Sequence, residues 1–491
     1  MAEGLLQPQK GKRIEDVGEE YWNALISKSF FQRNNTWNLN ISMHDLMHDL
    51  AMHISGQSCF IYDSCNDSGK LITNSKIRHL SYMKDLKDTI EFDNFSRVKH
   101  LRTLLALPLR HIWRSLETQF KLEMVLKDGG CLKTLSLSQS HITNLPDSIG
   151  NLKQLRYLDV SGTKIKELPL SICELYNLET LLLMYCNDLT QLPTNISNSI
   201  NLRHLVTRWT RLKEMPPNIC NMTNLQRLSD FVLCKSGGSR IKELGKLENL
   251  HGSLHVSGLS YVNDVSDVLE GELRNKKYLD ELILSWNGTK DNSTKEKEVL
   301  NALQPHVNLK KLEIIGYNGT SLPDWQFDLK RCGKLNVALP GCNFPSLEVI
   351  NVVHCDEMVT IFPTSTHIDS AYSSLKTLSI NNCSRLETFS VMGLPPSLRS
   401  LYITSCDMLV DNRMKWNLQS LPSLNDLDLC RCEVVVDSFP EEWLLPPSLK
   451  ALKVFNCNNL RALTPHLPSS IRTSIFGKAG VITTNRTASK Y

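Results

Sequence analysis

The chain has 491 residues, carries a formal net charge of +4, and 22% of its residues are charged. A charge this close to balance gives no reason to expect nucleic acid or an anionic membrane surface as a partner. No apolar run approaches the roughly 18 residues of a membrane span, and the polar first 20 residues lack the apolar core of a secretory signal. We therefore expect a cytoplasmic chain without a membrane span.

Residues 1–60 predict a small helical segment. Asp16 and Glu19 have the spacing of a capping box that opens a helix, after which apolar residues recur at helical spacing. A polar turn at 34–40 precedes a short strand and a second helix that begins near Ser42. This order predicts part of a winged helix. It is too small to hold a full core, so we expect it to continue upstream in a parent chain.

Two histidines of the second helix, His44 and His48, have the spacing of a zinc-protease helix. That site also needs a glutamate base and a third ligand. Here Asp45 stands in the place of the glutamate, and no further ligand motif follows. We therefore expect no metal at this position, and a structural or nucleotide-sensing role for His44.

A Leu-x-x-Leu-x-Leu phrase dominates the sequence from residue 61 onward. A transition segment, 61–125, holds two irregular copies, and the regular copies lie between 126 and 235 at steps of 23 or 24 residues. They begin at Leu132, Leu155, Leu178, Leu202 and Leu225. A fixed period of this size predicts a solenoid in which each strand buries its leucines against the next repeat. The fold class is therefore α/β, a leucine-rich-repeat horseshoe preceded by the partial winged helix.

A Leu-Pro pair accompanies the regular copies, with isoleucine three residues after the proline. It is found at Pro146, Pro169 and Pro193. Proline lacks the N–H that a ladder position needs. We therefore expect each pair to end the outer segment of its repeat.

Residues 236–475 continue the repeats in irregular form, and 476–491 form a C-terminal tail. One register of these repeats carries cysteine, at Cys355, Cys383, Cys406, Cys432 and Cys457. The total of 15 cysteines is odd, and no secretory signal precedes them, which favours reduced thiols. Because buried cysteine behaves as a small apolar residue, we interpret this register as a structural ladder and expect no metal site.

Residues that alternate with the ladder leucines are expected on the concave side of the solenoid. Among them, aromatic, apolar and cationic side chains are candidate anchors for a protein partner. The candidates are Tyr157, Leu182, Met184, Arg208 and Trp209 in the regular repeats, and Tyr317, Tyr402 and Phe455 further on; Asp159 and His204 accompany them. Leu182 and Met184, with Tyr157 and Trp209, are expected to form an exposed apolar patch that binds a partner or a missing nucleotide-binding module. A solenoid offers a long surface and no natural catalytic pocket, so we expect no catalytic residues and no enzyme activity.

The segment Met43-His44-Asp45-Leu46 resembles the MHD motif of plant nucleotide-binding leucine-rich-repeat resistance proteins. Flanking segments such as Ser29-Phe30-Phe31-Gln32 and Lys76-Ile77-Arg78-His79 resemble the coiled-coil class of that family. The resemblance covers essentially the whole chain. It implies an intracellular immune receptor whose repeats sense a pathogen effector or a guarded host protein and restrain a nucleotide switch. It also implies that His44, followed by Asp45, approaches ADP and helps to hold the resting state.

The family's Gly-x-x-x-x-Gly-Lys-Ser/Thr phosphate loop is not found in this sequence. We therefore expect a truncated product, a fragment or a partial gene model with no ADP or ATP cofactor of its own, in which His44 contacts ADP only within an intact receptor. The nucleotide-binding module of a parent or related receptor is then an expected partner. A nonsignalling adaptor or decoy remains an alternative. An extracellular receptor ectodomain is a weaker one, because no signal peptide is found and the cysteines are unpaired.

Overall fold

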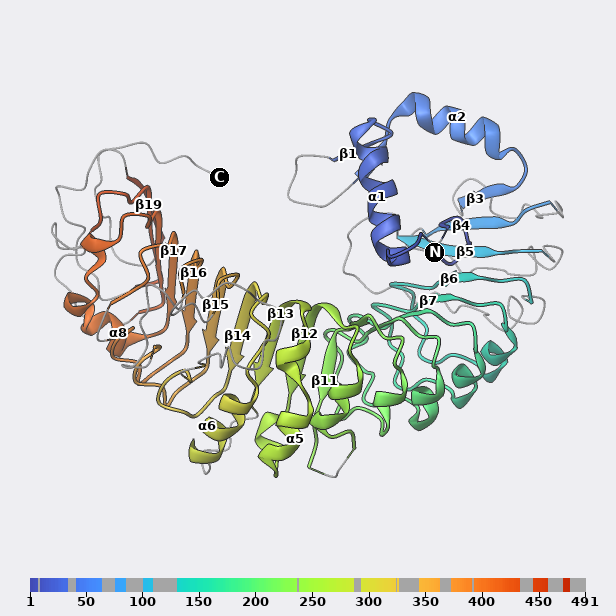
Figure 1. Cartoon of the computed structure of the whole chain (residues 1–491). Helices are drawn as coiled ribbons and strands as arrows, with labels where there is room; N and C mark the ends of the chain where they lie inside the picture. Colours follow the sequence, from blue (N-terminus) through green and yellow to red (C-terminus); the bar gives the residue numbers. More distant parts are fainter. Residues whose placement is uncertain are drawn as a thin grey trace. The chain divides into compact units, whose positions relative to one another are not determined.

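The computed structural model describes residues 1–7, 9–33, 41–63, 76–84, 100–108, 130–235, 238–286, 293–323, 325, 344–362, 372–390, 393–432, 445–457 and 471–476. The chain forms two compact units, Met1–Gln226 and Arg227–Tyr491. Each is a stack of repeats around a parallel sheet, and the first also carries the helical N-terminal segment (Figure 1). The predicted α/β leucine-rich-repeat fold is confirmed.

The N-terminal segment consists of two helices and a hairpin. Its elements are α1 (Ile14–Ser27), β1 (Phe31–Arg33), β2 (Ile41–Met43) and α2 (Asp45–Ser55). The hairpin strands are antiparallel, and Gln32 lies opposite Ser42. On α1, Val17 is fully buried, whereas the apolar side chains Leu46, Leu50 and Ile54 of α2 are 73%, 48% and 73% exposed.

The helix starts differ from the predicted ones. Helix α1 begins at Ile14, and its N-cap residue Arg13 makes no side-chain capping bond, so the capping box predicted at Asp16 is wrong. Asp16 instead accepts a hydrogen bond from Arg13 Nε at 2.9 Å. Ser42 lies in strand β2 rather than in a helix, because its backbone pairs with β1, and α2 begins three residues later.

Repeats of the first unit contribute one parallel sheet. Its strands, each paired with the next along the chain, are β3 (Cys59–Asp63), β4 (His79–Lys84), β5 (Thr103–Pro108), β6 (Thr134–Ser136), β7 (Tyr157–Asp159), β8 (Thr180–Leu182) and β9 (His204–Val206) (Figure 1). The register aligns the ladder, because Leu135 lies beside Leu158 and Leu158 beside Leu181. All three side chains are fully buried, so the predicted ladder forms a continuous core.

The side of each repeat opposite the strands is built from short 3₁₀ helices. In the first unit these are η2 (Asp147–Asn151), η3 (Leu170–Glu174), η4 (Thr194–Asn198) and η5 (Ile219–Asn221). Pro146, Pro169 and Pro193 are the N-cap residues of the first three. The Leu-Pro pair therefore precedes an outer segment instead of ending one, since the missing N–H and fixed φ of proline suit a helix start.

Asparagine side chains join neighbouring repeats on this outer side. The Nδ2 atoms of Asn177 and Asn201 donate to the carbonyl oxygens of Lys153 and Tyr176, each at 2.7 Å. In the next repeat, Asn224 Nδ2 donates to the carbonyl oxygen of Ile200 at 2.8 Å. These bonds satisfy backbone acceptors that the strand ladder leaves open.

The second unit has the same plan, with two short strands followed by longer ones. They are β10 (Arg227–Leu228), β11 (Asp230–Val232), β12 (His251–Ser257), β13 (Tyr278–Ser285), β14 (Lys311–Ile315), β15 (Val349–Val353), β16 (Thr377–Asn381), β17 (Ser400–Thr404), β18 (Asp426–Cys430), β19 (Ala451–Phe455) and β20 (Arg472–Phe476). From β11 to β20 each strand pairs in parallel with the next (Figure 1). The helical elements are η6 (Ile241–Lys246), η7 (Leu259–Tyr261), α5 (Val265–Glu270), η8 (Leu273–Asn275), α6 (Ser293–Ala302), α8 (Asp407–Asp411), η10 (Arg413–Lys415) and η11 (Leu418–Ser420).

A left-handed residue ends most strands, two positions after the last ladder residue. At Gly316, φ is 68°, and a Cβ would lie 2.6 Å from the carbonyl oxygen of Trp286, so the position requires glycine. Elsewhere the same conformation is adopted by Gln139, Tyr185, Trp209, His354, Asn382, Ser405, Arg431 and Asn456, with φ between 51° and 59°. Such backbones cost a residue with a Cβ on the order of 1 kcal/mol.

The cysteine register forms a file of thiols inside the second unit. Cys355, Cys383, Cys406 and Cys432 are buried, and Cys457 is half-buried. Each of the first two reaches back toward a carbonyl oxygen of the repeat before it, with Cys355 Sγ 3.8 Å from Ile314 O and Cys383 Sγ 3.9 Å from Val352 O. The interpretation of this register as a structural ladder agrees with their burial.

Candidate protein-binding surface

Residues that alternate with the ladder leucines form rows on the open face of the first unit's sheet, here called the strand face. One row contains Tyr157, Thr180 and His204; the next contains Asp159, Leu182 and Val206. Tyr157 is half-buried, and burial together with the Asp159 carboxylate raises the pKa of its hydroxyl to about 12. The phenol therefore stays protonated and can act as a hydrogen-bond donor.

The structure separates core from surface in the repeat that holds the predicted apolar patch. Leu181 and Leu183 are fully buried, whereas Leu182 and Met184 are half-buried and reach the strand face. Leu182 lies beside Val206, which is only 5% exposed. Leu182 and Met184 therefore expose only part of their apolar surface, less than the exposed patch predicted from the sequence.

Trp209 and Arg208 were predicted between ladder leucines, but they lie beyond the end of β9, and Trp209 adopts the left-handed turn position. The Trp209 ring stacks on Tyr185, with ring centroids 4.4 Å apart and planes 10° apart. The Arg208 guanidinium lies 5.7 Å from the centre of the Trp209 ring. These three residues are called the aromatic stack. Tyr185 and Trp209 are 42% and 53% exposed, so the stack presents both rings to solvent.

Tyr185 is not among the candidates predicted from the sequence. It occupies the same turn position as Trp209, one repeat earlier. Because the two residues are separated by one repeat period, the sequence alone could have indicated that they lie side by side. Two aromatic residues at that position in adjacent repeats must stack, because neighbouring strands are about 4.8 Å apart. The stack is worth on the order of 1 kcal/mol beyond the area that it buries.

Helix α1 contacts the strand face through one carboxylate. Arg203 donates to both oxygens of Glu15 at 2.8 Å, from Nε and from a terminal nitrogen. His204 Nε2 lies 3.3 Å from Glu15 Oε1, and its Nδ1 lies 2.9 Å from the hydroxyl of Thr180. Glu15, Arg203 and His204 are called the Glu15 clamp. The geometry is the two-pronged pairing that guanidinium and carboxylate favour.

The Glu15 carboxylate of the clamp stays ionised across the physiological pH range. Burial alone would raise the pKa of Glu15, but hydrogen bonds from His204, its own backbone and Arg203, with the Arg203 charge, lower it to about 2. Glu15 also lies in the first turn of α1, where the helix dipole favours an anion. The sequence pattern predicts His204 on this face but reveals neither Glu15 nor Arg203 as its partners, because the two are distant from each other in sequence.

A second carboxylate repeats the contact nearer the start of the chain. The hydroxyl of Thr103 on β5 donates to Glu3 Oε1 at 2.6 Å, and that of Thr134 on β6 does so at 3.4 Å. Figure 1 shows the N-terminus beside these strands. Two carboxylates of the N-terminal segment, Glu3 and Glu15, are therefore bound to the strand face.

His44 is exposed and is the N-cap residue of α2. Its Nδ1 accepts a hydrogen bond from the backbone N–H of Leu46 at 3.3 Å, so the ring has a local structural role. Asp45 follows in the first turn and is also exposed.

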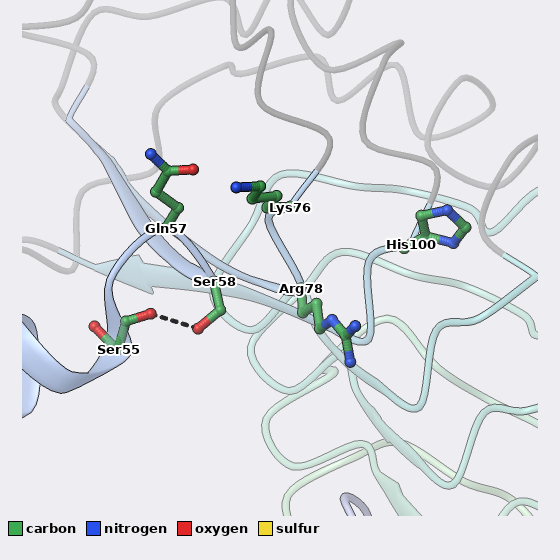
Figure 2. A pocket seen from close by; sticks show the side chains of 6 residues that line it. All are labelled: Ser55, Gln57, Ser58, Lys76, Arg78 and His100. Carbon is green, nitrogen blue, oxygen red and sulfur yellow. Dashed lines mark hydrogen bonds between the residues drawn. The ribbon is translucent and has the colours of Figure 1, made fainter.

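A polar cavity of about 580 Å³ lies where α2 meets the first strands (Figure 2). Its lining residues are Ser55, Gln57, Ser58, Lys76, Arg78 and His100. The hydroxyl of Ser58 donates to the carbonyl oxygen of Ser55 at 2.6 Å and closes the turn after α2 (Figure 2). His44 and Asp45 do not line this cavity.

Tyr317 does not belong to the surface on which it was predicted. It is fully buried, and its ring centre lies 5.3 Å from that of Trp286. The reason is its register: Tyr317 follows Ile314 by three residues, as Cys355 follows Val352, so it takes the inward position of the cysteine file. Tyr402 on β17 and Phe455 at the end of β19 are half-buried and lie on the strand face of the second unit.

Within the ranges that the structure describes, no cluster of three or more His, Cys, Asp or Glu side chains is arranged to hold a metal ion. No helix in the same ranges combines the length and the apolar character that a membrane crossing demands.

Two family models match the chain. The model for the disease resistance protein winged helix domain matches residues 1–51, and that for R13L1/DRL21 leucine-rich repeats matches 241–361. The first match confirms the winged-helix prediction for the N-terminal segment.

Similar full-length proteins are plant disease resistance proteins. The Arabidopsis thaliana protein At3g14460 is 39% identical over 87% of this chain and 32% of its own length. RPP13-like protein 1 of the same plant is 37% identical over 96% of this chain and 45% of its own length. RGA2 of Solanum bulbocastanum is 33% identical over 96% of this chain and 47% of its own length. The chain thus spans less than half the length of these relatives.

Solved structures with a similar path include a leucine-rich-repeat protein of Leptospira interrogans, at 17% identity and a TM-score of 0.46, which covers 84% of this chain and 99% of that chain. The plant peptide hormone receptor RGFR1 in complex with RGF2 is 14% identical, with a TM-score of 0.35. The match covers 82% of this chain and 71% of the receptor chain.

Proposed function

Because the chain belongs to the family of plant disease resistance proteins with leucine-rich repeats, we propose that it is the sensing and autoinhibitory repeat region of an intracellular immune receptor. In this proposal the chain is a binding protein and not an enzyme. Its partners are a pathogen effector or a guarded host protein, and the nucleotide-binding module of a parent or related receptor.

The Glu15 clamp is the observation that carries the autoinhibitory part. It joins a helix of the winged-helix segment to the strand face of the repeats through a charged, two-pronged contact. A partner that binds the strand face more tightly when α1 is released will shift the equilibrium toward release, by as much as its affinities for the two states differ. The clamp therefore links occupancy of the repeats to the position of α1.

The aromatic stack is the part of the surface that we assign to sensing. Tyr185, Trp209 and Arg208 are the residue types that most often supply binding energy at interfaces. Large rings already stacked on each other lose little conformational freedom on binding. The stack and the clamp share a repeat, because Arg203 and Arg208 flank the same strand, β9.

We further propose that the chain alone holds no nucleotide, and that His44 meets ADP only when a nucleotide-binding module is present. Support comes from its position: the ring is exposed at the start of α2 and has one local partner, the N–H of Leu46. A phosphate site needs several converging donors, which a single ring cannot supply.

Co-expression in leaves tests the autoinhibitory part. The full chain and the nucleotide-binding module of a related resistance protein are expressed as separate polypeptides, and co-precipitation and ion leakage from dying cells are measured. The wild-type chain is expected to bind the module and to lower leakage, and Arg203→Glu to lose at least half of that suppression. Arg211→Glu, at an exposed arginine of the same unit, is the control. If the wild-type chain neither binds nor suppresses, the receptor assignment fails.

The sensing part is tested separately by proximity labelling in infected leaves with the full chain as bait. Trp209→Ala is expected to reduce labelling of the partner about tenfold, the loss typical of an interface anchor. Tyr176→Ala is the matched control, because Tyr176 is 67% exposed and also has a cation over its ring, Lys153 at 5.6 Å, but lies outside the strand face. Partner labelling without any effect on the module favours the alternative, an adaptor or decoy that binds and does not signal.

A further inference from the structure

The last two members of the cysteine file differ from the others in their access to solvent. Cys383 and Cys406 are both buried, and the backbone N–H of Cys383 lies 3.5 Å from Cys406 Sγ. Cys432 is buried as well, but Cys457 is only half-buried. The file therefore contains one pair enclosed in the core and one pair in which one residue, Cys457, is partly exposed.

The backbone aligns Cys432 with Cys457 for a bond between their sulfur atoms. In the parallel pair β18–β19, Cys430 lies beside Phe455, and the two cysteines follow two residues later. Arg431 and Asn456, the residues between, have φ angles of 51° and 52°, so both chains turn in the same way. Neighbouring strands place such residues about 4.8 Å apart, inside the Cα separation of roughly 4.4–6.8 Å that a disulfide needs.

The two thiols also contact each other, and this contact shifts their pKa values in opposite directions. A hydrogen bond from Cys432 lowers the pKa of Cys457 to about 7, against the opposing effect of burial. The same hydrogen bond, with burial, raises the pKa of Cys432. In the enclosed pair, contact with Cys355 and burial raise the pKa of Cys383 to about 12, and that of Cys406 is raised too. Thiolates are the reactive form, so reactivity should concentrate at Cys457.

We propose that Cys432 and Cys457 form a reversible redox site that is oxidised to a disulfide by hydrogen peroxide. The Cys457 thiol first ionises. Its thiolate attacks one peroxide oxygen, the O–O bond breaks, and the departing hydroxide takes up the proton that the Cys457 thiol released and leaves as water. Cys457 is then a sulfenic acid. The Cys432 sulfur attacks the Cys457 sulfur, the S–S bond forms, the S–O bond breaks, and a second water leaves. Two thiols lose two electrons, and one peroxide is reduced to two waters.

Peptide mapping of the full chain tests this site. The reduced protein is treated with hydrogen peroxide under native conditions at pH 7, quenched with an alkylating reagent, digested without reduction and analysed by mass spectrometry. We expect a peptide pair joined through Cys432 and Cys457, two mass units lighter than the two thiol peptides, and absent after treatment with dithiothreitol. Cys383 and Cys406, at the same register, are the control within the molecule and should oxidise at least about tenfold more slowly.

Single substitutions identify the attacking thiol. With Cys432→Ser, Cys457 should stop at the sulfenic acid, which dimedone traps; with Cys457→Ser, Cys432 should stay reduced. Cys430→Ser should leave the link intact, since Cys430 lies on β18 opposite Phe455. Absence of the link in the wild-type chain overturns the proposal. So does a link through Cys430, or oxidation of the enclosed pair at the same rate.

Discussion

Replacing Glu15 by glutamine is expected to release α1 from strand β9 without disturbing the repeats. The fall of the Glu15 pKa from 4.5 to about 2 corresponds to about 3 kcal/mol at neutral pH, at 1.36 kcal/mol per pH unit. The side chains of Glu15 and Arg203 are 19% and 25% exposed, so solvent screening lowers the contribution to about 1–2 kcal/mol. The population of released α1 should therefore rise about tenfold.

Amide hydrogen exchange of α1, followed by mass spectrometry at pH 7, measures this release. A helix of 14 residues is marginal when isolated, so release should expose its amides, and their exchange should be about tenfold faster in Glu15→Gln than in wild type. Glu19→Gln, at an exposed position of the same helix, is the control and should leave exchange unchanged. Added salt should reduce the difference in α1 exchange rate between Glu15→Gln and wild type, because the ion pair is partly exposed and salt screens it.

The pH dependence has a defined sign. A carboxyl group whose pKa is lowered on folding contributes its full stabilisation above the unfolded pKa of 4.5 and loses it as the pH falls through about 2. The difference in melting temperature between wild type and Glu15→Gln should therefore be constant at neutral pH and vanish between about pH 4.5 and 2. Equal exchange of α1 in the two proteins, or equal acceleration by Glu19→Gln, would refute the role of the clamp.

Four further outcomes are expected. Leu182→Glu with Met184→Glu should leave the circular dichroism and melting of the chain nearly unchanged; a loss beyond about 3 kcal/mol would assign both residues to the core. Tyr317→Ala should cost about 3–5 kcal/mol in urea unfolding, whereas Tyr317→Phe should cost less than about 1 kcal/mol, since the buried hydroxyl has no hydrogen-bond partner within the described parts of the chain. Calorimetry of the purified chain should detect no ADP or ATP binding; a Kd below about 10 µM would contradict this. In an intact receptor carrying this segment, His44→Ala should cause cell death without a pathogen; wild-type behaviour would reduce His44 to a helix cap.

Periodicity made the solenoid predictable, because alternation along a strand determines which side chains face the core. Leu181 and Leu183 are buried and Leu182 is half-buried for this reason alone. The cysteine file followed from the same register. Strand β3 was not predicted, since Tyr62 fills its buried position instead of leucine and the ladder phrase is missing.

The leucine periodicity does not predict which residues occupy the turns or which residues distant in sequence form pairs. Trp209 was assigned to the strand because the regular repeats were read without their left-handed turn, and Tyr317 was assigned to the surface because an aromatic ring replaces cysteine in an inward position. The Glu15 clamp joins residues 188 positions apart, Glu15 and Arg203, so no local spacing reveals it. Only the fold brings them together.

The asparagine bonds on the outer side have a consequence for how such a chain changes in length. Asn177, Asn201 and Asn224 each donate a side-chain hydrogen bond to the repeat immediately before their own. Within that unit, stability is thus close to a sum of terms between adjacent repeats. Removing one complete repeat replaces two contacts by one of the same kind, so the ladder can be shortened or extended by whole repeats while its cross-section stays the same.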